Sequence, residues 1–168
     1  MRRNFLWATL VILAALIQTT WLDVITVRGV QPDLVLLLVV YFAILDGEER
    51  AMWTGALGGV FSDVATSTRL GHHVVCFVIV GYVLGQISHR LIKEHPIVKA
   101  VLVVASALAY GVLYNFVSNL IDPEHRAFSA IANETIPGAF YTAVFAPIMF
   151  FVLSRFFVRK HLSQGGFA

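Results

Sequence analysis

The chain contains little charge and almost no cysteine. Asp, Glu, Lys and Arg make up only 13% of its 168 residues, about half the share in an ordinary soluble domain. The net charge of +2 is too small to indicate nucleic acid or another polyanionic partner. The single cysteine, Cys76, cannot form an internal disulfide, which excludes a disulfide-rich secreted module.

Apolar residues take the place of the missing charge. Hydrophobic residues account for 58% of the chain, and the mean hydropathy is +0.80. A folded chain of this size buries only about two-thirds of its surface in water, so much of this apolar surplus would remain exposed. The composition therefore predicts a membrane protein and excludes a cytosolic enzyme or a nucleic-acid reader.

Six apolar stretches are spaced along the whole chain. A helix needs about 20 apolar residues to cross the hydrocarbon core of a bilayer. The longest gap, residues 122–134, has 13 residues and leaves no room for a soluble domain. We therefore expect an all-α, polytopic membrane protein, a six-transmembrane-helix bundle that forms a single integral membrane domain over residues 1–168. The stretches are 5–22, 32–45, 51–64, 74–87, 97–121 and 135–157.

Basic residues give the expected orientation. Bacterial membrane proteins keep an excess of Lys and Arg in their cytoplasmic loops. Six spans with the N-terminus and the C-terminus in the cytoplasm put nine basic residues inside and three outside. Stretches 32–45 and 51–64 have only 14 residues each, so two short spans and a re-entrant hairpin both remain open. The inside residues are Arg2, Arg3, Arg50, Arg90, Lys93, Lys99, Arg155, Arg159 and Lys160, and the outside ones are Arg28, Arg69 and Arg126.

Two carboxylates lie at the ends of apolar stretches. Pro32 and Asp33 open the second stretch, where proline suits the first helical turn and an acid faces the positive end of the helix dipole. Asp33 is therefore predicted to start a helix, or to present its carboxylate to a partner at the outer face. Asp63 ends the third stretch and needs a partner, because an intramembrane acid costs about 2.5–3.5 kcal/mol at the bilayer centre. Arg69 is one candidate, and nearby hydroxyl groups are others; a structural and a binding role both remain open.

Small residues recur four positions apart in three of the stretches. Such pairs let two helix backbones approach closely in lipid. We expect them to pack helices within the chain, with recognition of a second membrane protein as the alternative. The pairs are Gly55 and Gly59, Gly81 and Gly85, and Ala105 and Ala109.

The remaining polar residues show no catalytic or metal-binding pattern. Zinc takes three or four protein ligands, and His72-His73 has no third one near it in the sequence, so we expect two solvated or headgroup-facing imidazoles. A polar stripe in stretch 97–121 either lines a cavity or bonds to other helices; it comprises Tyr110, Tyr114, Asn115 and Asn119. No phosphate loop, nucleophile elbow or triad is found, which predicts a protein that is not an enzyme and needs no cofactor.

The central part of the chain resembles the rod shape-determining protein MreD family. The resemblance covers the chain length, the six-span hydropathy and residues 32–85. Its motif begins with Pro32-Asp33-Leu34 and the apolar run to Tyr41, and continues through Gly47, Gly55, Gly59, Asp63, Leu70-Gly71 and Gly81-Tyr82, with Gly85 as its last residue.

The resemblance implies a non-catalytic scaffold of the bacterial elongation (rod) complex in the cytoplasmic (inner) membrane. Such a protein binds MreC and helps maintain cell shape through lateral peptidoglycan synthesis. MreB, RodA and its partner transpeptidase are implied through the complex, and membrane lipid surrounds it. The implied fold is similar to the substrate-binding subunit of energy-coupling-factor transporters. The interaction or structural candidates are Pro32, Asp33, Gly55, Gly59, Asp63, Arg69, Gly71, Gly81 and Gly85.

Within this interpretation, we expect the glycine faces to pack tightly and to leave a groove for a partner's transmembrane helix or juxtamembrane segment. Asp33, Asp63, Arg69 and Gly71 would shape its outer end. The alternative is a solute-binding subunit of a vitamin-type transporter. That class docks through an Ala-x-x-x-Ala pair in its first span, whereas here Ala8 is followed by Ile12 and Ala15 by Thr19.

Overall fold

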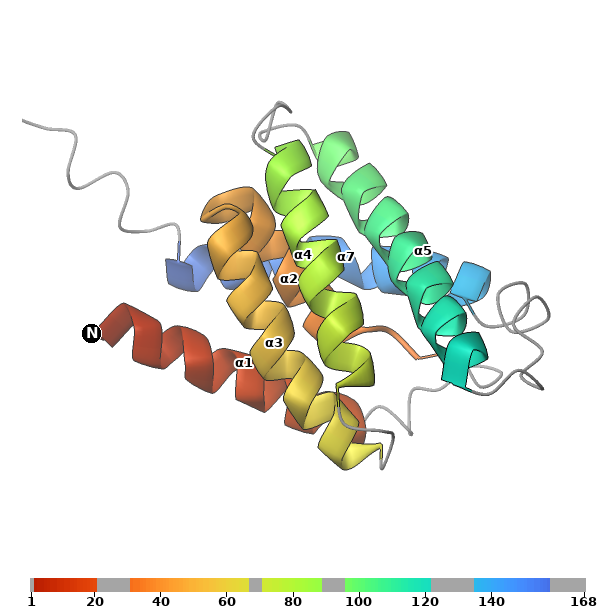
Figure 1. Cartoon of the computed structure of the whole chain (residues 1–168). Coiled ribbons are helices and arrows are strands. Elements are labelled where there is room, and N and C mark those ends of the chain that lie inside the picture. Colours follow the sequence, from red (N-terminus) through yellow and green to blue (C-terminus); the bar gives the residue numbers. More distant parts are fainter. Residues whose placement is uncertain (1, 21–30, 67–70, 89–95, 122–134, 158–168) are drawn as a thin grey trace, which may run out of the picture.

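The described part of the chain is built from six helices. The computed structural model describes residues 2–20, 31–66, 71–88, 96–121 and 135–157 (Figure 1), and these ranges contain no strand. All six apolar stretches predicted from the sequence coincide with helices. They are α1 (Arg2–Thr20), α2 (Leu34–Leu45), α3 (Glu48–Ala65), α4 (His72–Ser88), α5 (Pro96–Ile121) and α7 (Ile136–Phe157).

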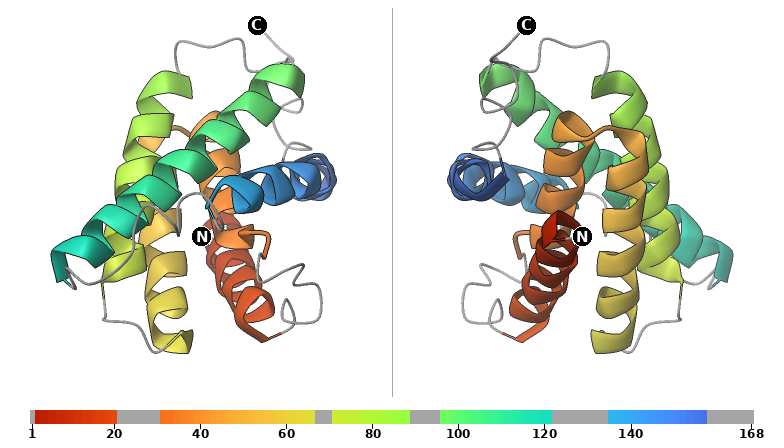
Figure 2. Two further views of the ribbon diagram at one scale, coloured as in Figure 1. Left: turned by 90° about the vertical axis from the view of Figure 1, so that its right-hand side faces the viewer. Right: turned by 90° about the vertical axis from the view of Figure 1, so that its left-hand side faces the viewer.

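Helix α2 is the centre of the molecule. Its residues from Val35 to Ala43 are all buried, and it contacts α1, α3, α4, α5 and α7. Figures 1 and 2 show the other helices arranged around it. A helix that is apolar on every side has no face to offer to water and is stable only when it is enclosed. The uniformly apolar sequence LVLLLVVYFAIL is compatible with enclosure by lipid or by protein, and in this fold the other helices enclose it.

Helix α2 begins beside the end of α1, and the turn that follows α2 brings the chain back beside the beginning of α1. Near the end of α1, Gln18 accepts a hydrogen bond from the backbone N–H of Val35 at 3.0 Å. Near its beginning, Asn4 accepts one from the guanidinium of Arg50 at 2.9 Å. Gly47 makes the turn into α3 with φ of 88°, a left-handed conformation that glycine adopts without steric cost. The α2–α3 turn thus lies beside the start of the chain.

Helices α3 and α4 pack backbone to backbone along a glycine seam, which we define as Gly55, Gly59, Gly81 and Gly85. A Cβ atom added to Gly55 would lie 2.8 Å from the carbonyl carbon of Phe77, and one on Gly59 would lie 2.6 Å from Cα of Val74. Real Cβ atoms do not approach other atoms so closely. The two α3 glycines are therefore required by the approach of α4.

The two α4 glycines contact α3 in the same way. A Cβ atom on Gly81 would lie 3.0 Å from the backbone of Ala51, and one on Gly85 would overlap the backbone of Glu48. The predicted internal packing is thus confirmed for both pairs. These glycine faces cover each other, so they do not themselves form an open groove for a partner. The third pair differs, because Ala105 and Ala109 are exposed on α5.

Helices α5 and α7 present apolar surface to the outside. The segments Ile97–Ile121 and Ile136–Arg155 are long and apolar enough to cross a membrane, and Asn4–Thr20, Leu34–Leu45 and His72–Ser88 are shorter apolar helices. Such a large exposed apolar area is rare on a monomer in water and is suited to lipid. The most exposed large side chains on these two helices are Ile97, Val101, Phe116, Leu120, Phe140, Val144, Ile148 and Phe151.

We predict that Gly59→Ala lowers the thermal unfolding midpoint of the protein in detergent. The added methyl group must push α3 and α4 apart, and overpacking of this kind costs about 1–3 kcal/mol. Ala105→Leu, which adds a larger group on the exposed face of α5, serves as the control and should leave the midpoint nearly unchanged. Equal midpoints for Gly59→Ala and the parent protein would contradict the seam.

Candidate functional site

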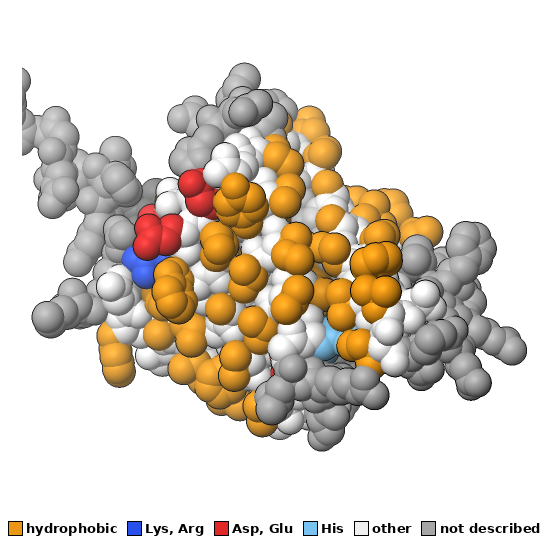
Figure 3. Space-filling view, in the orientation of Figure 1, with side chains coloured by type: hydrophobic (Ala, Val, Ile, Leu, Met, Phe, Trp, Pro, Cys, Tyr) orange, Lys and Arg blue, Asp and Glu red, His pale blue; other side chains and the backbone are white. Residues whose placement is uncertain are grey.

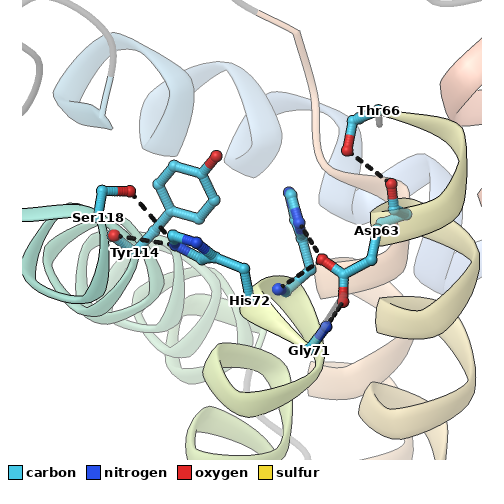
Figure 4. Close-up of polar contacts among 8 residues, drawn as sticks. Asp63, Thr66, Gly71, His72, Tyr114 and Ser118 are labelled. Atoms are coloured by element: carbon cyan, nitrogen blue, oxygen red, sulfur yellow. Dashed lines mark hydrogen bonds and ion pairs between the residues drawn. The ribbon is translucent and has the colours of Figure 1, made fainter. Parts of the chain in front are cut away.

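Buried and half-buried polar residues gather where α3 ends and α4 begins. This polar cluster, which we define as Asp63, Gly71, His72, His73, Tyr114 and Ser118, joins α3, α4 and α5 (Figure 4). Polar groups in such a place must be hydrogen-bonded, because burial without a partner costs several kcal/mol. The contacts of each member therefore show what the cluster does.

Asp63 caps the beginning of α4 from the neighbouring helix. Its carboxylate is only 1% exposed. One oxygen accepts from the backbone N–H of Gly71 at 2.8 Å, and the other accepts from the backbone N–H of His73 at 2.9 Å. The first N–H groups of a helix have no partner within it, and a carboxylate at this end also opposes the helix dipole. Asp63 thus has a structural role that the sequence left undecided.

The side chain of His73 also binds the carboxylate of Asp63. Its Nδ1 lies 2.8 Å from Asp63 Oδ1, and because a carboxylate can only accept, Nδ1 carries the hydrogen. The sequence had suggested Arg69 as the partner of Asp63, but Arg69 lies outside the described residues. Among the described residues the partners are His73 and two backbone N–H groups.

Gly71 permits the turn that brings these donors to Asp63. Its φ is 99°, a region that side chains other than glycine rarely adopt. It stands directly before α4 and donates its own N–H to the carboxylate. Asp63 and Gly71, which the sequence singled out separately, therefore act together, whereas a Cβ atom on Gly71 would meet nothing within 4 Å.

The two histidines are buried, so the prediction of solvated or headgroup-facing imidazoles was wrong. His72 is 9% exposed, and the side chain of His73 is 12% exposed. His72 Nε2 lies 3.2 Å from the carbonyl oxygen of Tyr114 and 3.3 Å from the hydroxyl of Ser118. Its ring also packs on that of Tyr114, with centroids 4.2 Å apart. Helix α5 covers the first turn of α4, which the sequence spacing could not reveal.

The residues of the polar stripe of α5 have different surroundings. Tyr110 stacks on Phe77 of α4, with ring centroids 4.5 Å apart and planes within 7°. Asn115 donates to the backbone carbonyl of Gly111 at 2.8 Å and is buried, whereas Asn119 is exposed. Of the two predicted roles, contact with other helices is the one that the tyrosines perform.

Asp33 starts α2 and ties it to α7. Its carboxylate accepts from the backbone N–H of Leu36 at 2.9 Å, the arrangement of an N-cap. Its own N–H donates to the hydroxyl of Thr142 at 3.1 Å. The predicted helix start is confirmed, with one correction: Pro32 is buried and precedes the cap instead of occupying the first turn.

The chemistry of this region is that of hydrogen bonding between helices. The oxygens of Asp63 are occupied by donors, and His72 is held against α5. Within the described residues, no three His, Cys, Asp or Glu side chains are grouped so that they could hold a metal ion. The contact of His73 with Asp63 was not predicted, although a Gly-containing turn between residues 63 and 73 is a signal that a helix end and a helix start lie side by side.

These observations define a class: an all-helical membrane protein whose buried polar side chains fix the ends of its helices. The family model for the rod shape-determining protein MreD matches residues 1–160. The chain therefore belongs to the MreD family and has a role in rod shape determination. Neither the comparison with curated proteins nor the comparison with solved structures gave a match.

We predict that Asp63→Ala lowers the thermal unfolding midpoint in detergent and that Asp63→Asn lowers it less. The alanine leaves the N–H groups of Gly71 and His73 without this partner, at about 1–3 kcal/mol for each buried group. The asparagine keeps one oxygen acceptor. Ala65→Ser, at an exposed position in the same turn, is the control. The capping role is wrong if Asp63→Ala unfolds at the parent midpoint.

Proposed function

We propose that the chain is a non-catalytic scaffold of the bacterial elongation complex in the cytoplasmic membrane. In this role it binds MreC and, through the complex, acts with MreB, RodA and its partner transpeptidase in lateral peptidoglycan synthesis. The observation that carries the proposal is the family match over residues 1–160. The surface chemistry and the course of the helices support it.

A multi-pass arrangement with both termini in the cytoplasm is part of the proposal. The start of α2 lies beside the end of α1, and the start of α3 lies beside the beginning of α1, which supports two crossings rather than a re-entrant hairpin. Helix α4 then returns to the same end, since the hydroxyl of Ser88 donates to the carbonyl of Ala43 at 2.7 Å. Helices α1 to α4 therefore alternate in direction over a common depth, as successive membrane spans do, and α5 and α7 are long enough to continue the series.

The distribution of polar and apolar groups supports a binding role. The polar cluster is turned inward and its hydrogen bonds join helices of the same chain. Helix faces and short turns remain available to other molecules, and in lipid such faces associate through van der Waals contact and hydrogen bonds between helices. A protein of this kind acts by holding neighbours in a fixed arrangement.

The proposal predicts that deleting the gene in the native bacterium converts rods to rounded cells. The parent chain should restore rods, and MreC should co-purify with it from detergent extracts. Ala105→Leu, which alters only an exposed position of α5, is a matched variant for expression and handling. A folded, membrane-inserted parent chain that restores shape without retaining MreC would exclude the direct MreC contact, and failure to restore shape would exclude the scaffold role.

A further inference from the structure

An acidic turn lies at the end of the molecule where α1 begins. Asp46 follows the end of α2, Glu48 and Glu49 lie in the first turn of α3, and Arg50 bonds to Asn4 at the start of the chain. The expected orientation puts this turn in the cytoplasm, where membrane proteins usually collect Lys and Arg. Figure 3 shows the acidic side chains gathered at the border of an apolar surface. These acids stand in a region to which the sequence also assigns Arg2, Arg3 and Arg50, so their individual contacts decide which of them is available.

A groove opens between α1 and α3 at this end. It measures about 630 Å³, and we call it the acidic groove. Its inner wall is fixed, because the indole N–H of Trp7 donates to the hydroxyl of Thr54 at 2.9 Å. Its rim carries the indole of Trp53, which is 60% exposed. The residues that line it are Asn4, Trp7, Asp46, Glu49, Arg50, Trp53 and Leu57.

Charged side chains of both signs line the acidic groove. Among the described lining residues Arg50 is the one cation, and this guanidinium is already engaged. It lies 3.6 Å from the carboxylate of Asp46 and 4.9 Å from the ring centre of Trp7, in addition to its bond to Asn4. Glu49 is exposed and makes no ion pair with any described residue. The groove therefore offers a carboxylate beside aromatic surface, a combination suited to a cation on an apolar stem.

An apolar stripe continues from the groove along α3. Trp53, Leu57, Val60 and Val64 recur at helical spacing on one face, with Val60 47% and Val64 64% exposed. From Trp53 to Val64 the stripe is about 16 Å long at 1.5 Å per residue. Figure 3 shows apolar side chains extending from the acidic end over this side of the molecule. A helix lying along the stripe would end beside the carboxylates.

We propose that the acidic groove and the apolar stripe together bind a transmembrane helix of a partner protein that carries Lys or Arg at its cytoplasmic flank. The cytoplasmic flanks of membrane helices are usually basic. The stripe receives the apolar helix, and the groove receives a basic side chain, its stem against Trp53 and its charge at Glu49. This inference rests on the proposed function and orientation, which supply MreC as the partner to test.

Charge favours a protein helix over lipid at this position. Anionic headgroups are repelled by the exposed carboxylate of Glu49, whereas a basic flank is attracted, by about 1 kcal/mol per charge in comparable interfacial settings. The acyl chains of lipid cover other apolar faces, such as that of α7, without needing carboxylates beside them. The combination of stripe and groove is therefore more specific than apolar exposure alone.

Photocrosslinking locates the partner. A photoreactive phenylalanine derivative is placed at Trp53 or Val60, and at Phe140 or Val144 on the exposed face of α7 as matched controls, with MreC co-expressed. We expect crosslinks to MreC from positions 53 and 60 that are several-fold stronger than those from 140 and 144. Crosslinks to MreC only from α7, to a second copy of this chain, or to lipid alone would overturn the proposal.

Charge reversal tests the groove itself. Glu49→Lys should weaken co-purification of MreC about ten-fold, equivalent to about 1.4 kcal/mol, because two like charges would face each other. Glu49→Gln should weaken it less, and changing the basic flank of MreC to Glu should restore recovery with Glu49→Lys. Glu49 is exposed, so folding should be preserved, which the thermal unfolding midpoint checks.

The outcomes separate this inference from the proposed function. If the parent chain recovers no MreC, the direct MreC contact fails. If the parent recovers MreC and both Glu49→Lys and Trp53→Ala do so equally well, the scaffold role stands and this binding surface is wrong. Loss of recovery with unchanged thermal midpoints supports the surface.

Discussion

The close approach of α3 and α4 determines where the other features of the molecule lie. Glycines on both helices remove the side chains that would keep the backbones apart, and each helix then contacts the other over most of its length. At one end this proximity brings Asp63 to the free N–H groups of α4. At the other end it holds the backbone of Glu48 against Gly85 and so fixes the acidic turn. The polar cluster and the acidic groove are thus two ends of one packing arrangement.

The separation of buried polar side chains from exposed ones explains how a protein with so little charge can still bind a partner selectively. Helix α2 takes up the central position and needs no polar group of its own, while Asp33 and Asp63 serve the beginnings of helices. Because few charged side chains lie on the surface, each of them distinguishes its region from the apolar remainder more clearly than a charge on a soluble protein would. Around the start of α1, Glu49 and Trp53 distinguish one helix face from the uniformly apolar faces of α5 and α7.

Much of this fold could be predicted because a helix in lipid needs a long apolar stretch of sequence, and such stretches are easily recognised. Six apolar stretches gave six helices, and the four-residue spacing of Gly55 and Gly59 indicated close packing. The environment of His72 and His73 could not be predicted, since it depends on α5, which crosses the start of α4 from a distant part of the chain. The partner of Asp63 was missed for a related reason: Arg69 is nearer in sequence, but His73 is carried to the carboxylate by the turn at Gly71. The six spans and the likeness to transporter subunits stay predictions.

The cap that Asp63 provides also bears on how the protein is made. A nascent α3 that left the translocon alone would carry a buried carboxylate into lipid without its donors, and it would expose a glycine surface with little apolar area. Once α4 has been synthesised and packs on α3, it supplies hydrogen-bond donors to Asp63 and covers the glycine surface. Residues 48–88 are therefore suited to enter the bilayer as a paired hairpin, with the ribosome supplying both helices before either is released sideways. Membrane insertion and the final packing of α3 on α4 would then depend on the same contacts, those of Asp63 and of the glycine seam.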